Sequence, residues 1–185
     1  MLAVRTVGHG ALAAEDFATL VAGAGIDVVV DIRRFPGSRR HPHFGRDEMA
    51  DWLPARGVEY RWLPALGGRR PAVPDSPNTA LRNEQFRAYA DHMATAEFRT
   101  GVDELLGVAQ DAGWSAAVMC AESLWWRCHR RLLADHLVLV AAVPVQHLFH
   151  DGRLAHHQPT PEARRADGHV VYDLTSQGEL FGEPV

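Results

Sequence analysis

The sequence predicts an α/β protein: a single Rossmann-like domain with a mostly parallel, five-stranded sheet and helices on both faces. Short apolar runs rich in β-branched residues alternate with stretches in which apolar residues recur at helical spacing. Parallel strands need such helical crossovers between them. The chain has 185 residues, 46% of them apolar and 23% charged, and shows no internal repeat or linker. Its length and composition therefore suit one globular domain.

The expected elements follow in order along the chain. Strands are expected at 2–8, 26–32, 58–66, 115–120 and 143–149. Helices are expected near 17–24, 49–53, 86–93, 98–109 and 128–140. Pro54 should end the second helix early, and the segment 67–80, rich in glycine and proline, should be a loop. We divide the chain into an α/β domain, residues 1–150, and an extended polar C-terminal tail, residues 151–185.

Composition excludes several classes of function. The chain has no lysine, so all 19 positive side chains are arginine, and neither a Schiff-base lysine nor a P-loop lysine is available. No run approaches the roughly 18 apolar residues of a membrane helix, and the first residues lack the features of a signal peptide. The two cysteines, Cys120 and Cys128, fit a reducing compartment. We expect a cytoplasmic protein without a membrane partner.

Polar side chains and glycines occur where four of the expected strands end. In open parallel sheets the ligand crevice lies beyond these carboxyl ends, so we expect one site there. The candidate catalytic residues are Glu122, Asp31, His9 and Cys120. The candidate phosphate contacts at the same strand ends are Arg33, Gly67 and Gly68.

The same positions carry a family resemblance over about residues 4–150. Its motifs, in order, are Val7-Gly8-His9, Asp31-Ile32-Arg33, Phe35-Pro36, Ser38-Arg39, Pro42-His43-Phe44, Leu66-Gly67-Gly68, Phe86-Arg87-Ala88-Tyr89-Ala90, Met119-Cys120-Ala121-Glu122 and Cys128-His129-Arg130. This pattern resembles the family catalogued as domain of unknown function 488. The resemblance implies a Rossmann-like domain with a polar cleft and brings no settled activity. The sequence departs from the pattern at Gly10, where serine is expected.

Glu122 and Asp31 suggest carboxylate chemistry. Two carboxylates in one crevice beside His9 can be held at different pKa values by burial and by their neighbours. Such a pair suits cleavage of an N-glycosidic bond, in which one carboxylate stabilises a developing oxocarbenium ion or activates water, while His9 assists proton transfer. The alternative is that Asp31 only orients Arg33.

Two basic segments are expected to bind phosphate. Residues 33–46 hold five arginines and two histidines and no acid, and arginine favours forked contacts to phosphate. The candidates there, besides Arg33, are Arg39, Arg40 and His43. At the start of a helix, where free backbone N–H groups favour an anion, the candidates are Cys128, His129 and Arg130. The alternative for residues 33–46 is a solvated loop. The alternative for the helix start is that His129 or Arg130 only pairs with Glu122 or Asp31.

The cysteines and aromatic residues allow further interpretations. A buried cysteine is more often a small apolar residue than a reactive one. Cys120, Cys128 and His129 offer metal ligands, but their spacing matches no four-ligand structural zinc pattern. We therefore predict no cofactor and keep a divalent metal as an alternative. The aromatic residues Tyr89, Trp125 and Trp126 are candidates to stack on an extruded base, although tryptophans usually lie in the core.

The tail points to DNA. Residues 177–181 read Gln-Gly-Glu-Leu-Phe, which looks like the Gln-x-x-Leu-Phe peptide that docks bacterial repair proteins on the replication sliding clamp. Gln177, Leu180 and Phe181 are the candidate docking residues, unless the apolar pair packs on the domain itself. We expect a DNA-associated enzyme, a repair-type hydrolase similar to a DNA glycosylase. The alternatives are a metal-dependent phosphoesterase or nuclease, and a non-catalytic nucleotide- or nucleic-acid-binding regulator.

Overall fold

The computed structural model describes residues 3–37, 39–113 and 115–173, and confirms the predicted α/β fold. The main sheet has the strand order β3-β2-β4-β1-β5-β6, in which all neighbours pair in parallel except β5 and β6. Its strands are β1 (Val4–Gly8), β2 (Val28–Asp31), β3 (Glu59–Trp62), β4 (Ala116–Cys120), β5 (Val145–Leu148) and β6 (Leu154–His156). The helices are α1 (Ala14–Gly23), α2 (Arg46–Trp52), α3 (Glu84–Met93), α4 (Ala96–Asp111) and α5 (Arg130–Leu139).

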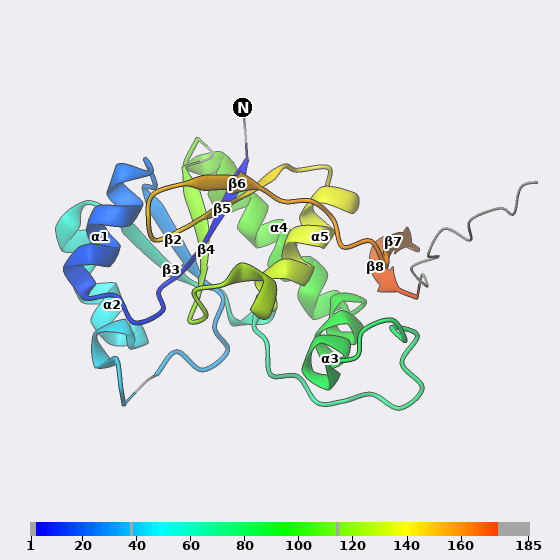
Figure 1. Ribbon diagram of the computed structural model, residues 1–185. Helices are drawn as coiled ribbons and strands as arrows, with labels where there is room; N and C mark the ends of the chain where they lie inside the picture. The colour runs from blue at the N-terminus through cyan, green and yellow to red at the C-terminus, as the bar shows by residue number, and fades with distance from the viewer. Residues whose placement is uncertain (1–2, 38, 114, 174–185) are drawn as a thin grey trace, which may run out of the picture.

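Helices cover both faces of the sheet, as predicted. Because successive side chains of a strand point to opposite faces, Val28 and Val30 of β2 pack with residues of α3, α4 and α5, whereas Val29 packs with residues of α1 and α2. Figure 1 shows α1 and α2 on one side of the sheet and the other three helices across from them. A central strand buried on both faces explains the continuous apolar run of β2.

The crossover connections open a crevice at the carboxyl ends of the parallel strands. The chain leaves β1 into α1 on one face and leaves neighbouring β4 into α5 on the other face. Connections that diverge in this way leave a gap beyond the carboxyl ends of the two strands. The ends of β1 and β4 therefore face a common space.

The sheet has six strands and not the expected five. β6 pairs antiparallel with β5 at the sheet edge, and its side chains are exposed or half-buried, so its sequence lacks the apolar alternation of a buried strand. A second sheet, the hairpin of β7 (Ala163–Ala166) and β8 (His169–Tyr172), packs against α3 and α5 through β8. Residues 151–173 are thus largely extended, and part of this segment belongs to the main sheet.

The loops follow the expected turn chemistry. α2 ends at Trp52, and a short 3-10 turn (Pro54–Arg56) leads to Gly57 with a positive φ of 78°, as Pro54 predicts. The 67–80 segment has no helix or strand among its residues. Its Asn78 side chain donates to Asp91 and accepts from the Tyr172 backbone, at 2.8 and 3.0 Å. None of the described helices has the length and apolar character of a membrane span.

Candidate active site

The main cleft lies at the carboxyl ends of β1, β2 and β4 and has a volume of about 600 Å³. The residues that line it are His9, Gly10, Ala11, Arg33, Arg34, Phe35, Gly37, His41, Gly68, Arg69, Cys120, Ala121, Glu122, Ser123 and His129. A second cavity of about 820 Å³ shares six of these residues, among them Gly68, Cys120, Glu122 and His129. The cleft therefore brings together six of the predicted residues, which are His9, Arg33, Gly68, Cys120, Glu122 and His129.

Asp31 is fully buried and its carboxylate is fully engaged. Its Oδ1 accepts from the backbone N–H and the Nε of Arg33, both at 2.9 Å. Its Oδ2 accepts from Arg33 Nη2 at 2.6 Å and from the Tyr60 hydroxyl at 2.7 Å. A carboxylate held by four donors has no free lone pair for a substrate. This arrangement fits the alternative that Asp31 orients Arg33.

His9 and Arg33 complete this buried group. Arg33 Nη1 lies 3.2 Å from His9 Nε2, and Arg33 Nη2 also donates to the Phe44 carbonyl at 2.7 Å. Burial, and then the positive charge of Arg33, lower the pKa of His9 to about 3. The neutral ring donates from Nδ1 to the Gly10 carbonyl at 2.9 Å, which leaves Nε2 as acceptor for Arg33. Both nitrogens are occupied, so His9 is poorly placed to move a substrate proton.

Glu122 is exposed and lies on the wall of both cavities. Its Oε1 accepts a hydrogen bond of 3.3 Å from the Leu124 backbone N–H. Arg130 holds the loop that carries Glu122. Its guanidinium donates to the Glu122 carbonyl and lies 3.5 Å from the Thr6 hydroxyl. Arg130 is 1% exposed, so it positions the Glu122 loop and does not reach the cleft.

Gly10, where the chain departs from the family pattern, has a left-handed backbone with φ of +55°. A Cβ at this position would lie 2.2 Å from the Ser123 hydroxyl, closer than any real contact. The positive φ therefore favours glycine in the turn that carries the chain from β1 past the Glu122 loop. The hydroxyl on this side of the cleft comes from Ser123.

The cations at the cleft mouth differ from those that the sequence selected. Arg34 and Arg69 line the cleft, and Arg34 Nη1 donates to the Arg69 carbonyl at 3.1 Å. Arg39 and Arg40 are exposed but are not among its lining residues. His43 lies 3.0 Å from the Leu12 carbonyl through its Nε2, where it packs against the neighbouring Phe44 ring.

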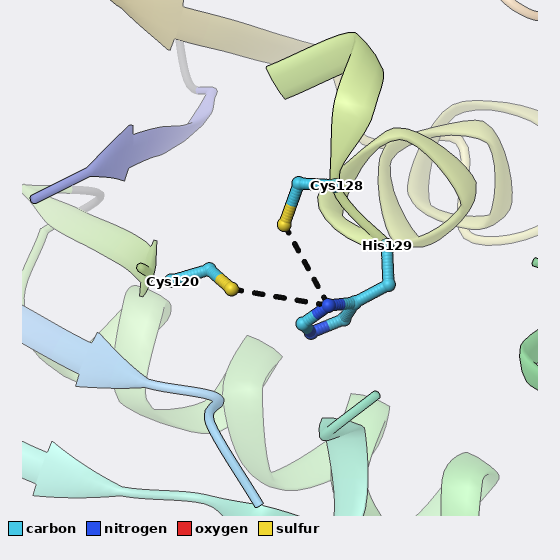
Figure 2. Close-up of side chains that lie close together, drawn as sticks. All are labelled: Cys120, Cys128 and His129. Carbon is cyan, nitrogen blue, oxygen red and sulfur yellow. Dashed lines mark hydrogen bonds between the residues drawn. The ribbon is translucent and has the colours of Figure 1, made fainter. Parts of the chain in front are cut away.

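Cys120, Cys128 and His129 form a sulfur–imidazole cluster between β4 and the start of α5, as Figure 2 shows. The Sγ atoms of Cys120 and Cys128 lie 3.8 and 3.6 Å from His129 Nδ1. The hydrogen bond to Cys128, together with burial, raises the pKa of the Cys120 thiol. Burial also acts to raise the pKa of Cys128, but the Cys120 hydrogen bond and the charges of His129 and Arg130 outweigh it and lower that pKa.

The three aromatic candidates lie in different surroundings. Tyr89 is fully buried, donates to the Leu66 carbonyl at 2.8 Å, and packs 4.9 Å from the His129 ring. Trp125 stacks on His147 with ring centroids 4.0 Å apart, so its face is covered. Trp126 is 43% exposed but is absent from the lining of both cavities. Trp125 and Trp126 contact each other edge to face, with ring centroids 5.6 Å apart, but neither lines the two cavities, whereas Tyr89 lines the second.

Some predicted residues contribute through the backbone or lie outside the described residues. Gly68 faces the cleft, whereas the Gly67 carbonyl accepts from Arg70 at 2.9 Å. The candidate docking residues Gln177, Leu180 and Phe181 lie outside the described part of the chain. Sequence reasoning missed Arg69, although it directly follows the Gly67-Gly68 motif. It lines the cleft and has a positive φ of 58°.

Fold and cleft define a class: a mostly parallel α/β protein with a polar cleft at the carboxyl ends of its strands. The chain belongs to the family described as "Domain of unknown function DUF488", whose profile matches residues 13–137. Searches of curated proteins and of solved structures found no match.

Proposed function

We propose that this protein hydrolyses an N-glycosidic bond of a nucleotide or of DNA, with Glu122 as the catalytic carboxylate. One observation carries this proposal. Of the described residues that line the two cavities, Glu122 alone offers a carboxylate, and the other candidate acid, Asp31, is held by Arg33 and Tyr60.

The reaction needs one well-placed negative charge. As the bond between the sugar carbon and the base nitrogen breaks, positive charge develops on the sugar ring, and a carboxylate can stabilise it or take a proton from the attacking water. The water oxygen joins the sugar carbon, and the departing base nitrogen gains a proton. Glu122 is exposed to the cleft and its carboxylate accepts one hydrogen bond of 3.3 Å, from the Leu124 N–H, so it can approach a bound sugar.

The cleft mouth supplies the contacts that a phosphate needs. Arg34 and Arg69 both line the cleft beside Gly68, and an arginine guanidinium matches phosphate oxygens with paired donors. The volume of about 600 Å³ falls within the range of small-molecule sites. A nucleotide would place its phosphate near these arginines and its sugar near Glu122.

The two other functions carry less support. A phosphoesterase with His9, Asp31 and Glu122 as metal ligands would need lone pairs that Arg33 and Tyr60 already occupy on the first two residues. A regulator without turnover would use the same arginines and would not need Glu122 as a reactive group. Product analysis separates all three.

The experiment is a turnover screen of the purified protein with mononucleotides and with oligonucleotides that carry modified bases. We expect release of a free base, detected by mass spectrometry, and loss of at least about 100-fold in rate for Glu122→Gln. Glu104→Gln, on the exposed face of α4, is the matched control and should keep full activity. Backbone cleavage or phosphate release would support the phosphoesterase instead, and binding without any product would support the regulator.

DNA as substrate and the sliding clamp as partner are part of the same proposal. Their support is the Gln177 to Phe181 sequence together with the arginines of the cleft. The test is binding of the full chain to purified sliding clamp, compared with the double variant Leu180→Ala and Phe181→Ala. We expect the double variant to lose binding with an unchanged melting temperature. A lower melting temperature, with no clamp binding by the unmutated chain, would show that the pair packs on its own domain.

A further inference from the structure

We propose that Cys120, Cys128 and His129 bind a Zn²⁺ ion whose fourth coordination position opens to the cleft. The proposal goes beyond the glycosidic function and does not rest on it, because the ion would occupy this position whether or not Glu122 acts on a substrate.

The distances match a tetrahedral metal site. The three ligand atoms lie within 4.8 Å of one another, and the two Sγ–Nδ1 separations are 3.6 and 3.8 Å. Zinc bonds of about 2.3 Å to sulfur and about 2.0 Å to nitrogen, at the tetrahedral angle, give a sulfur–nitrogen separation of about 3.5 Å. An ion can therefore contact all three atoms with only small adjustments of the side chains.

The cluster has few other hydrogen-bonding partners. The contacts of His129 Nδ1 are two sulfur atoms, which are weak hydrogen-bond partners. A metal on Nδ1 would replace these two weak contacts with a strong bond. The ring proton would then lie on Nε2, which is buried and has no hydrogen-bond partner among the described residues.

Space beside the ligand nitrogen is kept free by Gly68. A Cβ at this position would lie 2.9 Å from His129 Nδ1, within the volume that an ion and its fourth ligand need. Gly68, Cys120 and His129 line both cavities. Water or a ligand in the cleft can therefore reach the open position.

The donor set selects the metal. Two cysteine sulfurs with one imidazole suit Zn²⁺ and disfavour Mg²⁺ or Ca²⁺, which prefer oxygen. Two cysteines and one histidine with an open fourth position is also a ligand set of catalytic zinc sites. The sequence spacing gave no such site because it was compared with structural zinc patterns, which have four protein ligands.

Co²⁺ is the probe for the experiment, because tetrahedral Co²⁺ absorbs visible light and its thiolate bonds add a charge-transfer band in the near ultraviolet. The full chain, without a polyhistidine tag and reduced with a phosphine, is titrated with Co²⁺ and then with Zn²⁺. We expect both signals to saturate at one ion per chain and to disappear when Zn²⁺ displaces Co²⁺. A reduced wild-type protein that gives no charge-transfer band overturns the proposal, and this result requires no variant.

Variants assign the ligands. Cys128→Ser and His129→Asn should each lose the charge-transfer band or shift it and weaken Co²⁺ binding at least about 100-fold, with circular dichroism checking the fold. His156→Asn, which changes an exposed histidine on β6, should bind Co²⁺ as the wild type does. An unchanged spectrum in Cys128→Ser would place the ion elsewhere and overturn the proposal. Turnover plays no part in these readouts. A protein that binds no Co²⁺ would therefore leave the glycosidic proposal intact, and a protein without turnover would leave the metal proposal intact.

Gly68→Ala tests the open space. The added methyl group would crowd His129 Nδ1, so we expect Co²⁺ affinity to fall about tenfold or more. Gly107→Ala in α4 is the matched control, because a Cβ there meets nothing within 4 Å. Equal Co²⁺ affinities of the two variants would contradict the proposed position of the ion.

Discussion

Around Asp135 every carboxylate lone pair has a donor, whereas along the cleft wall Glu122 is left exposed. Asp135 is fully buried. Its Oδ1 accepts from His157 Nε2 at 2.9 Å and from the Thr160 backbone N–H at 2.8 Å. Its Oδ2 accepts from the hydroxyls of Thr160 and Tyr172, both at 2.8 Å. The Glu122 carboxylate accepts one hydrogen bond of 3.3 Å, from the Leu124 N–H, and faces the cleft.

The Asp135 network continues through the domain. His157 Nδ1 lies 3.0 Å from His147 Nε2, and His147 Nδ1 lies 2.8 Å from the Thr6 hydroxyl. This chain of contacts connects α5, β5 and β1 with the segment that follows β6. Its role is to hold the C-terminal part of the described chain on the sheet.

The comparison shows that residue type alone does not identify a functional group. Asp31 lies at a strand end, as Glu122 does nearby, yet its four donors place it with Asp135. What separates a structural carboxylate from a candidate catalyst here is whether its lone pairs are already used. The sequence does not show whether a carboxylate already accepts hydrogen bonds, because the donors come from residues such as Tyr60 and Thr160 that are distant along the chain.

One of the two largest expected losses of stability comes from Asp135→Ala. Removing the carboxylate leaves four buried donors without an acceptor, so we expect the free energy of unfolding to fall by about 3–5 kcal/mol, measured by chemical denaturation. The control is Asp173→Ala, which removes an exposed ion pair with Arg164 and should cost less than about 1 kcal/mol. Equal losses in the two variants would mean that the buried network adds nothing beyond a surface ion pair.

Acid should destabilise the fold through its buried histidines. Burial is the largest cause that lowers the pKa of His9 and His147 to about 3 and of His136 to about 4. Below pH 6.5 the unfolded chain binds protons at these rings and the folded chain does not. The free energy of unfolding should therefore decrease as pH falls from 6.5 toward 4, by up to about 1.4 kcal/mol per pH unit for each ring.

Chemical denaturation at several pH values between 6.5 and 5 checks this expectation. His136→Leu should flatten the dependence, because it removes one of the buried rings whose pKa is lowered in the folded protein. The Nδ1 of His136 has no hydrogen-bond partner among the described residues, so the substitution breaks no contact of that atom. A wild-type free energy of unfolding that stays constant over this range would contradict the assignment of neutral buried histidines.

A smaller effect is expected at the cleft mouth. The double variant Arg34→Ala and Arg69→Ala should weaken binding of a nucleoside monophosphate about 30-fold, since each of the two lost charged contacts contributes roughly 1 kcal/mol in an exposed site. The control pair is Arg39→Ala and Arg40→Ala, which lies outside the cleft lining and should leave mononucleotide affinity unchanged. If the control pair loses as much affinity, the phosphate lies over the 39–46 segment and not at the cleft mouth.

Much of the fold could be predicted because its signals are local. The apolar runs of β1, β2 and β4 and the helical spacing in α4 and α5 are visible in the chain itself. β6 was missed because an exposed edge strand forms only through its pairing with β5. The position of the cleft could be predicted from the topology, since the carboxyl ends of parallel strands all lie at the same end of the sheet.

The positions of residues around the cleft could be predicted only in part. Strand ends correctly brought Cys120, Glu122 and Gly68 to the same wall. They could not show that Arg130 turns inward to the Glu122 loop, because the direction of a long side chain depends on packing across the sheet. They also could not show that His129 faces both sulfurs, since the start of α5 and the end of β4 meet only in the folded protein.

The most direct measurement of the central claim compares Glu122→Gln with Asp31→Asn. For each variant, the free energy of unfolding and the rate of base release are determined on the same preparation. The account predicts that Glu122→Gln loses at least about 100-fold in rate with stability within about 0.5 kcal/mol of wild type. Asp31→Asn should lose about 3–5 kcal/mol of stability, because Arg33 is left buried without its partner. Two results together would contradict Glu122 as the catalytic carboxylate. They are full turnover in folded Glu122→Gln, and loss of turnover in an Asp31→Asn protein that is as stable as the wild type.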